Sequence, residues 1–202
     1  MLKIIGIISM TIDHIGYLFF PELAWTRIVG RIAFPIFAYG ISQGYIYTKN
    51  LKLYMYRLLI FALISQIPYY LFISRNHLNV IFTLLLGLIS LIFIDKYNFF
   101  AVLIPAAAAY LMKSEYGVYG ILITVFFYYF RNNHKMLFLT FSIMTVIYSV
   151  LIKWDLQLWS LIVLPFILCF KNTRINVNKY VFYAYYPLHI AVLGLIKTFM
   201  KG

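Results

Sequence analysis

The sequence is poor in charged residues. Only 11% of its 202 residues are charged, with 5 Asp and Glu against 17 Lys and Arg, whereas a soluble domain has about 25% charged residues. Its apolar content is 64% and its mean hydropathy is +0.91, while a soluble domain is roughly 45–50% apolar. These proportions exclude an ordinary soluble fold and predict an integral membrane protein.

Features of several other protein classes are also missing. The single cysteine, Cys169, excludes an internal disulfide and leaves no thiol partner for a metal ion. The sequence has no His, Cys, Asp and Glu cluster at ligand spacing, no serine nucleophile elbow and no glycine-rich phosphate loop. We therefore expect no metal site. Residues 1–20 lack a small-residue cleavage motif and contain Asp13 and His14, so we expect a retained first helix rather than a signal peptide.

Apolar runs separated by turn residues predict an all-α transmembrane bundle of about nine spans, with a range of eight to ten. A span needs about 20 apolar residues, so the shorter runs are expected to tilt or to be partly buried. No internal repeat or linker divides the chain, which predicts one integral membrane domain over residues 1–202. The predicted spans cover residues 2–20, 32–48, 55–73, 78–94, 99–112, 117–130, 136–152, 156–170 and 180–199.

The basic residues are scattered among the joints between spans. They do not form one stripe, so nucleic acid is not an expected partner, and membrane lipids are. With a cytoplasmic amino terminus, ten basic residues would lie on the cytoplasmic side and seven on the other, which favours that orientation for a multi-pass protein of the cell membrane. The ten are Lys3, Lys49, Lys52, Arg57, Lys96, Arg131, Lys135, Lys171, Arg174 and Lys179.

Ionisable residues within apolar spans are candidates for function, because an Asp or Arg at the centre of a membrane helix costs about 2.5–3.5 kcal/mol. Asp13 and His14 lie in the first predicted span, where His14 shares a helix face with Lys3. His14 can accept a proton near neutral pH, and a neighbouring carboxylate can orient or balance it. Since consecutive helical residues do not face each other, Asp13 can instead pair with Arg27 or Arg31, solely to make its burial tolerable.

A second group of polar residues surrounds the predicted span that contains Pro35. Arg27 and Arg31 precede it four residues apart, so on a helix they share one face and can clamp an anion. Interfacial snorkelling without a ligand is the alternative. The last predicted span contains Tyr186 and, three residues later, His189, which is the second intramembrane histidine after His14. A purely structural role is equally open for His189. The remaining candidates are Arg57, Gln66, Asn79 and Thr83.

Six segments resemble motifs of a known family. They are LKIIGIISMTIDHIG, RIVGRIAFPIFAYGISQGY, RLLIFALISQIPY, NVIFTLLLGL, EYGVYGILI and YPLHIAVL. In this order they resemble the TraX family, named after a protein that acetylates the amino terminus of conjugative pilin, and through it the wider membrane acyltransferase superfamily. Those relatives have a basic residue, usually arginine, upstream of a functional histidine, which here corresponds to Lys3 and His14. The resemblance leads us to expect an acidic residue where this chain has Gln66.

The resemblance implies transfer of an acetyl or other acyl group from acyl-CoA to an amine or hydroxyl of a peptide, glycan or small metabolite. His14 would be the general base and Asp13 would balance its developing charge, although a covalent acyl-histidine is also open. Acetyl-CoA would be the donor, without a metal. Its phosphates would contact Lys3, Arg27, Arg31 or Arg57. Contacts to the substrate or the oxyanion would come from Gln66, Asn79, Thr83, Tyr186 and His189.

Two other classes of function stay open from the residues alone. A proton-coupled transporter or channel would also use Asp13, His14 and His189 as a relay, and prolines within the predicted spans suit discontinuous helices. No inverted repeat supports that class. A non-enzymatic scaffold would need the same polar groups only for assembly. Replacing His14 by Gln separates the classes, because it should abolish acyl transfer and leave a scaffold folded and active.

Overall fold

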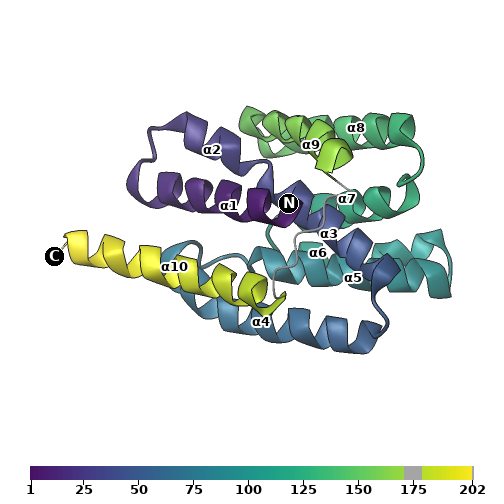
Figure 1. Ribbon diagram of the computed structural model, residues 1–202, viewed down its shortest axis with the longest axis horizontal. Helices are drawn as coiled ribbons and strands as arrows, with labels where there is room; N and C mark the ends of the chain where they lie inside the picture. Colours follow the sequence, from purple (N-terminus) through teal and green to yellow (C-terminus); the bar gives the residue numbers. More distant parts are fainter. Residues whose placement is uncertain (171–178, 202) are drawn as a thin grey trace. The chain divides into compact units, whose positions relative to one another are not determined.

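The computed structural model describes residues 1–170 and 179–201, which are almost entirely helical (Figure 1). These residues form ten α-helices, two 3₁₀ segments and no β-strand, with one isolated bridge between Leu78 and Ser114. The predicted all-α fold is confirmed. The elements are α1 (Leu2–Phe19), α2 (Ala24–Gly30), α3 (Ala33–Tyr47), α4 (Leu51–Phe72), α5 (Val80–Lys96), η1 (Phe99–Val102), α6 (Leu103–Leu111), α7 (Gly117–Tyr129), α8 (His134–Ile152), η2 (Asp155–Ile162), α9 (Val163–Phe170) and α10 (Lys179–Lys201).

Each predicted span coincides with a helical stretch to within about one helical turn at either end. Among the described residues, α1, α4 and α8 are long and apolar enough to cross a membrane, and the shorter apolar stretches are Phe99–Leu111, Gly117–Tyr129 and Asp155–Phe170. The apolar helices indicate a membrane protein, while the number of spans stays a prediction. Of the basic residues that predict the orientation, Lys171 and Arg174 lie outside the described residues.

The chain divides into two compact units. Unit 1 comprises Met1–Phe37 and Ser142–Gly202, and unit 2 comprises Ala38–Phe141. Unit 1 therefore contains α1, α2, η2, α9 and α10, and unit 2 contains α4, α5, η1, α6 and α7. Helices α3 and α8 pass from one unit into the other. The predicted single domain over residues 1–202 stays a prediction.

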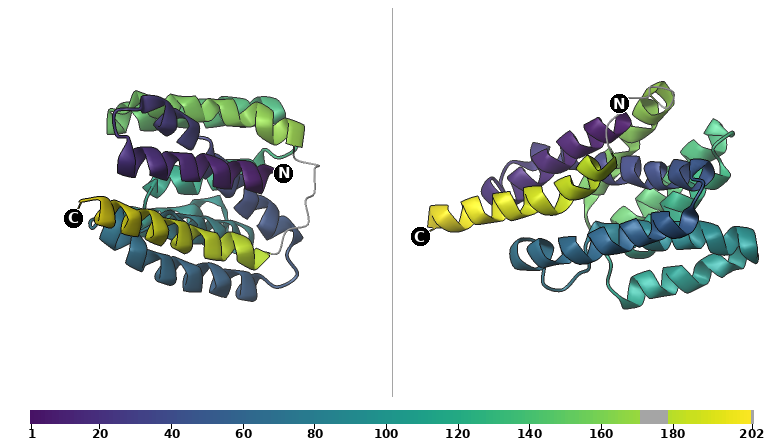
Figure 2. Two further views of the ribbon diagram at one scale, coloured as in Figure 1. Left: turned by 60° about the vertical axis from the view of Figure 1, so that its left-hand side comes forward. Right: turned by 60° about the horizontal axis from the view of Figure 1, so that its bottom comes forward.

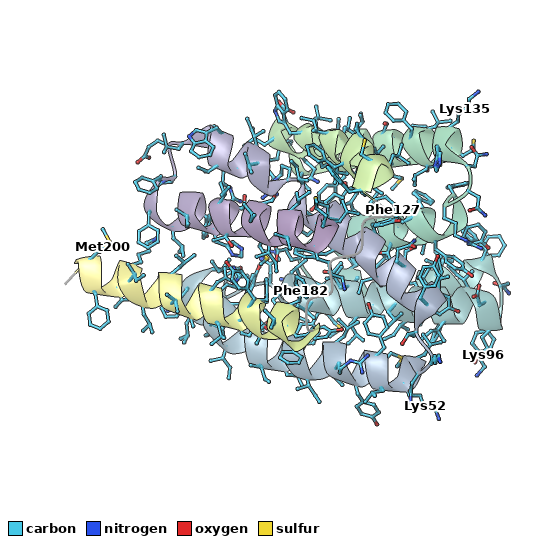
Figure 3. All side chains as sticks on the ribbon, in the orientation of Figure 1. Lys52, Lys96, Phe127, Lys135, Phe182 and Met200 are labelled. Carbon is cyan, nitrogen blue, oxygen red and sulfur yellow. The ribbon has the colours of Figure 1, made fainter. Side chains whose placement is uncertain are left out.

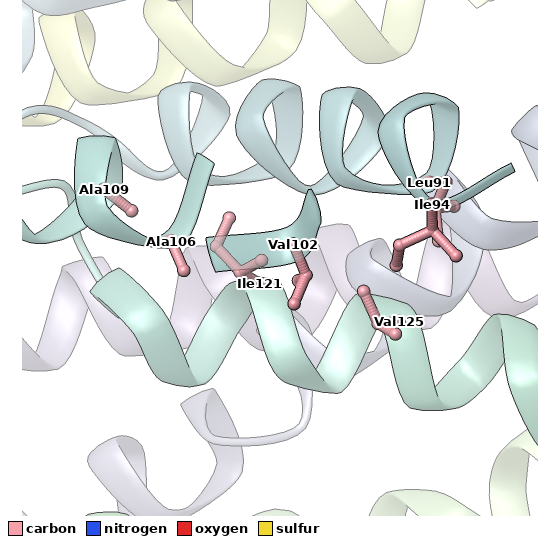
Figure 4. Close-up of a cluster of buried hydrophobic side chains, with 7 residues drawn as sticks. All are labelled: Leu91, Ile94, Val102, Ala106, Ala109, Ile121 and Val125. Atoms are coloured by element: carbon pink, nitrogen blue, oxygen red, sulfur yellow. The ribbon is translucent and has the colours of Figure 1, made fainter. Parts of the chain in front are cut away.

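Helix α5 is the centre of unit 2 and packs against α4, η1, α6 and α7. It is apolar and buried around most of its circumference, as is typical of a helix surrounded by other helices. The small side chains of α6 let neighbouring backbones approach closely. Figure 4 shows the resulting cluster, which consists of Leu91, Ile94, Val102, Ala106, Ala109, Ile121 and Val125.

Helix α4 has one buried face and one exposed apolar face. Leu58 and Ala62 are buried, whereas Leu63 and Ile67 on the other face are 55% and 67% exposed. A continuous exposed surface of large apolar side chains is unfavourable in water and is normally covered by a partner or by lipid. The length and composition of α4 therefore suit a helix that contacts lipid on its exposed face.

Helix α1 is the central helix of unit 1 and packs against α2, α9 and α10. Figure 2 shows α10 running alongside α1 in both views. Two glycines bring α1 and α2 together, because a Cβ on Gly16 would overlap Thr26 and a Cβ on Gly30 would overlap Asp13. This close approach places the arginines of the α2 region beside the carboxylate of α1.

Candidate active site

Asp13 on α1 is held by two arginines that follow it in the chain. Its Oδ2 atom lies 2.9 Å from Nη1 of Arg27, and its Oδ1 atom lies 2.9 Å from Nη2 of Arg31. Arg27 also donates a hydrogen bond to the backbone carbonyl of Asp13 at 3.2 Å. Asp13 and Arg31 are only 8% and 4% exposed. Buried charges of this kind are tolerated because they are paired and hydrogen-bonded.

A break between α2 and α3 brings Arg31 to this position. Pro35 has no N–H, and in a continuous helix its ring would collide with the carbonyl of residue 31. The chain therefore forms a tighter, 3₁₀-type turn after α2, in which the backbone N–H of Arg31 donates to the Ile28 carbonyl at 3.1 Å. The Arg31 Nε donates to the Arg27 carbonyl at 3.1 Å, and the Ser9 hydroxyl of α1 donates to the Val29 carbonyl at 2.6 Å.

Aromatic side chains cover the two guanidinium groups. The Trp154 ring centroid lies 4.5 Å from the guanidinium carbon of Arg31 and 5.7 Å from that of Arg27, and the Tyr17 ring lies 5.3 Å from Arg27. Trp154 is fixed through its backbone, since its N–H donates to the Ser149 carbonyl at 3.0 Å and its carbonyl accepts from the Ser149 hydroxyl at 2.9 Å. These cation–π contacts stabilise the arginines without neutralising them.

His14, the next residue on α1, pairs with His189 of α10. Nδ1 of His14 lies 2.7 Å from Nε2 of His189. The ring planes differ by 8° and the centroids are 4.9 Å apart, so the rings meet edge to edge in nearly one plane. Ring N–H bonds lie in the ring plane, so this geometry suits a direct hydrogen bond. Nδ1 of His189 lies 2.8 Å from the Tyr185 carbonyl oxygen, and the Tyr185 hydroxyl lies 2.7 Å from the hydroxyl of Thr11.

The two groups of side chains have different electrostatic character. Asp13, Arg27 and Arg31 together carry one net positive charge, because one carboxylate faces two guanidinium groups. Among the described residues, no hydrogen bond or ion pair joins the Asp13 carboxylate to His14, and the ring partner of His14 is His189. The arrangement therefore places a buried, hydrogen-bonded pair of histidines, which can act as a base, next to a buried cationic cluster.

Two further predicted residues of unit 1 lie at different distances from the histidines. Tyr186 is buried, and its ring centroid is 6.4 Å from that of His14 and 5.7 Å from that of His189. Lys3 is exposed near the start of α1, with its Nζ 5.4 Å from the ring of Phe182. The structure thus brings Tyr186 to the histidines and leaves Lys3 at the helix end.

Gln66 and Asn79 form a hydrogen-bond network in unit 2. The Gln66 Oε1 accepts from the backbone N–H and from the Nδ2 of Asn79, each at 2.9 Å, and its Nε2 donates to the His77 carbonyl at 3.1 Å. Asn79 is fully buried, donates to the Ala62 carbonyl at 2.8 Å and caps α5 through its side chain. These contacts join α4 to the start of α5. The amide of Gln66 uses both its donor and its acceptor here, which a carboxylate could not do.

The two remaining predicted residues also belong to unit 2. The Thr83 hydroxyl donates to the backbone carbonyl of Glu115. The guanidinium carbon of Arg57 lies 5.9 Å from the Tyr54 ring centroid, and its buried Nε has no hydrogen-bond acceptor among the described residues. The structure therefore brings together the predicted residues Asp13, His14, Arg27, Arg31, Tyr186 and His189 in unit 1. In unit 2 it joins Gln66 to Asn79, whereas Thr83 and Arg57 contact Glu115 and Tyr54 instead.

Four side chains of the site were not predicted from the sequence. Thr11 lies three residues before His14 on α1, and Tyr185 lies four residues before His189 on α10, so helical spacing could have placed each on the face of its histidine. Tyr17 lies four residues after Asp13, so the same spacing could have placed it on the face of Asp13. For Trp154, which comes from a distant segment, the sequence holds no such signal.

The fold and the site define a helical membrane protein with a buried histidine pair and a buried carboxylate bound by two arginines. Among the described residues, no group of three or more His, Cys, Asp and Glu side chains is arranged to hold a metal ion. The sequence model of a protein family, described as TraX protein, matches residues 1–197 of this chain. The chain belongs to the TraX protein family.

Two relatives extend this assignment. The chain is 27% identical over 238 aligned positions to the probable fimbrial assembly protein FimC, serogroup H1, of Dichelobacter nodosus, covering 99% of this chain and 96% of that protein. It is 43% identical over 67 positions to the uncharacterized protein RP591 of Rickettsia prowazekii (strain Madrid E), covering 33% of this chain and 25% of that protein. No solved structure matches the chain significantly.

Proposed function

We propose that the protein is a membrane-embedded acyltransferase that moves an acetyl or other acyl group from acyl-CoA to an amine or hydroxyl acceptor. The observation that carries this proposal is the buried hydrogen-bonded pair of His14 and His189. A neutral imidazole held in an apolar bundle can take up a proton during one step and release it in the next. Membership in the TraX family, which resembles the wider superfamily of membrane acyltransferases, supports the same reaction.

In the proposed reaction, His14 removes the proton of the acceptor amine or hydroxyl as its nitrogen or oxygen attacks the thioester carbonyl. A bond forms between the acceptor and the acyl carbon, and the carbon–sulfur bond breaks. The departing thiolate then takes the proton from His14, so free CoA thiol leaves and the imidazole returns to its neutral form. No oxidant, metal ion or further reactant is needed for this balance.

Asp13 has a different place in this proposal from the one expected from the sequence. It faces Arg27 and Arg31 instead of the His14 ring, so its contribution is to hold the two arginines in the bundle. The net positive charge of the cluster is available for the phosphates of the acyl donor, and Arg27, whose side chain is 20% exposed against 5% for Arg31, is the more accessible contact. Lys3, in the same unit, stays a secondary candidate for these phosphates, and the predicted phosphate contact of Arg57 in unit 2 stays a separate prediction.

The residues proposed to contact the substrate or oxyanion differ in how many of their donors are already used. Asn79 and Thr83 donate within unit 2, Gln66 donates once to a backbone carbonyl, and both ring nitrogens of His189 have partners. Tyr186 is the preferred contact to the acyl group because its ring lies beside both histidines.

The acceptor is proposed from chemistry and from one relative. A peptide amine, a glycan hydroxyl and a small metabolite all satisfy the reaction. The name of the FimC relative, a fimbrial assembly protein, favours testing the amino terminus of a fibre subunit first.

We also propose that the protein spans the cell membrane about nine times with a cytoplasmic amino terminus. In unit 2, Lys52, Lys96 and Lys135 extend from the same end (Figure 3), at the start of α4, the end of α5 and the start of α8. Lys49 and Arg131 flank the same helix ends. Basic residues concentrate on the cytoplasmic side of membrane proteins, which supports a cytoplasmic position for this end.

The test is release of free CoA thiol from acetyl-CoA by the purified protein in lipid nanodiscs, with and without a membrane-extract acceptor. Wild type is compared with His14→Gln and with His77→Gln, a control at an exposed histidine in unit 2. Acceptor-stimulated release that disappears only in His14→Gln supports the proposal. Equal release by all three proteins contradicts it, and substrate flux into sealed vesicles without acyl-CoA would indicate a transporter.

A further inference from the structure

The contacts of His189 determine which nitrogen of His14 carries a proton. We infer that His189 is a positioning residue that holds His14 as the Nδ1–H tautomer, so that Nε2 of His14 is the proton-accepting atom. The tautomer follows from the contacts, burial and charge of the site, whereas its use in acyl transfer rests on the proposed function. The role differs from the oxyanion contact that the resemblance implies for His189.

The first step of the argument concerns the Tyr185 carbonyl. A carbonyl oxygen only accepts hydrogen bonds, and its two lone pairs let it accept a side-chain donor in addition to a helical N–H. The Nδ1 atom of His189 lies 2.8 Å from this oxygen. A lone pair on Nδ1 would face the lone pairs of the carbonyl at that distance, so Nδ1 of His189 carries a hydrogen.

The second step concerns the charge of the pair. Both histidines are 8% exposed, and the adjacent cluster of Asp13, Arg27 and Arg31 already has one net positive charge. An additional buried cation there would be costly, so His189 is neutral and its Nε2 is an acceptor. The atom that faces it at 2.7 Å, Nδ1 of His14, must therefore donate.

The consequence is that Nε2 of His14 bears the free lone pair. Neutral histidine in water favours a hydrogen on Nε2, so the pair reverses the usual preference of the ring. The acceptor proton goes to Nε2 of His14 and cannot continue past His189, because the Tyr185 carbonyl does not take up a proton. The site therefore stores one proton, which suits its return to the leaving thiolate and does not suit a relay across the membrane.

Contacts around His189 keep its ring in this orientation. The Tyr185 ring lies parallel to it at a centroid distance of 5.0 Å and an interplanar angle of 11°. The hydroxyl of the same tyrosine pairs with Thr11 on α1 at 2.7 Å, one turn from His14. Helices α1 and α10 are thus joined by two polar contacts, and the ring that orients His14 is itself held from the side.

The tautomer is tested by nitrogen-15 NMR of the histidine rings in nanodiscs, with assignments from His77→Gln and His134→Gln backgrounds. We expect His14 with a hydrogen on Nδ1 and none on Nε2, and His189 likewise. In His189→Leu, His14 should change to the Nε2–H form, while His189→Gln, whose Oε1 can accept from His14, should keep the Nδ1–H form. An Nε2–H signal for His14 in wild type would overturn the inference, and the wild-type and Gln spectra decide it even where the Leu variant fails to fold.

Kinetics then test the role. The loss of an orienting partner that fixes a histidine tautomer costs up to about 10⁴-fold in kcat in a related arrangement. We therefore expect His189→Leu to lower kcat by about 100-fold or more with little change in KM for acetyl-CoA, and His189→Gln to recover most of the loss. Acyl transfer that needs His14 but tolerates His189→Leu would overturn the inference and leave the proposed function intact. If the spectra are as expected but the protein transfers no acyl group, the tautomer is supported and the proposed function is overturned.

Discussion

Replacing Asp13 by Asn tests the ion-pair cluster of unit 1. The substitution keeps the shape of the side chain and removes the carboxylate that contacts Arg27 and Arg31, so the charge of this cluster rises from +1 to +2. Removing one partner of a buried charge pair typically costs about 3–5 kcal/mol. For a chain of this size, 1 kcal/mol shifts the melting temperature by roughly 2–4 °C. We therefore expect Asp13→Asn to melt about 10 °C below wild type in detergent.

Two variants control this experiment. Asp155→Asn makes the same chemical change at an exposed position of unit 1 and should melt within about 1 °C of wild type. The double variant Asp13→Asn with Arg31→Gln restores the net charge of +1 and should recover part of the lost stability. If Asp13→Asn melts like Asp155→Asn, the reasoning about the buried charges is refuted.

Three other substitutions give predictions that follow from single contacts. Gly30→Ala places a Cβ against the carboxylate that it faces and should cost about 1–3 kcal/mol, whereas Gly40→Ala meets no atom within 4 Å and should be neutral or stabilising by up to about 1 kcal/mol; thermal melting separates the two. Trp154→Ala should lower the melting temperature more than Trp154→Phe, because phenylalanine retains an aromatic face for the arginines. Asn79→Ala should cost about 1–3 kcal/mol, since it removes a helix cap and two donated hydrogen bonds, whereas Asn76→Ala in the exposed turn should melt like wild type.

Much of the helical framework was predictable because apolar runs and turn residues alternate clearly along the chain. The range predicted as 99–112 is Phe99–Leu111 in the structure, and 117–130 is Gly117–Tyr129. The short helix Ala24–Gly30 was not predicted as a separate element, because seven residues that include an arginine give too weak a periodic signal. The break between α2 and α3 depends on Pro35. From the sequence, Pro35 was interpreted only as a kink within the predicted span 32–48.

The charged residues and histidines of the site were predictable individually, since each is a polar group in or beside an apolar run. Their pairing was not. His14 and His189 are 175 residues apart, and no local pattern links positions so distant. Asp13 and His14 are neighbours in sequence, but successive helical side chains diverge by about 100°, so the carboxylate faces α2 and the imidazole faces α10. The arginine pairing of Asp13 was recognisable as an alternative, whereas the aromatic cover from Trp154 was not.

The most direct test of the central claim follows the acyl group itself. Purified protein in nanodiscs is incubated with isotope-labelled acetyl-CoA and a membrane extract, and the labelled product is identified by mass spectrometry for wild type, His14→Gln and His77→Gln. We expect wild type and His77→Gln to transfer the label to an acceptor amine or hydroxyl and His14→Gln to transfer none. Label transfer by His14→Gln at the wild-type rate would contradict the account.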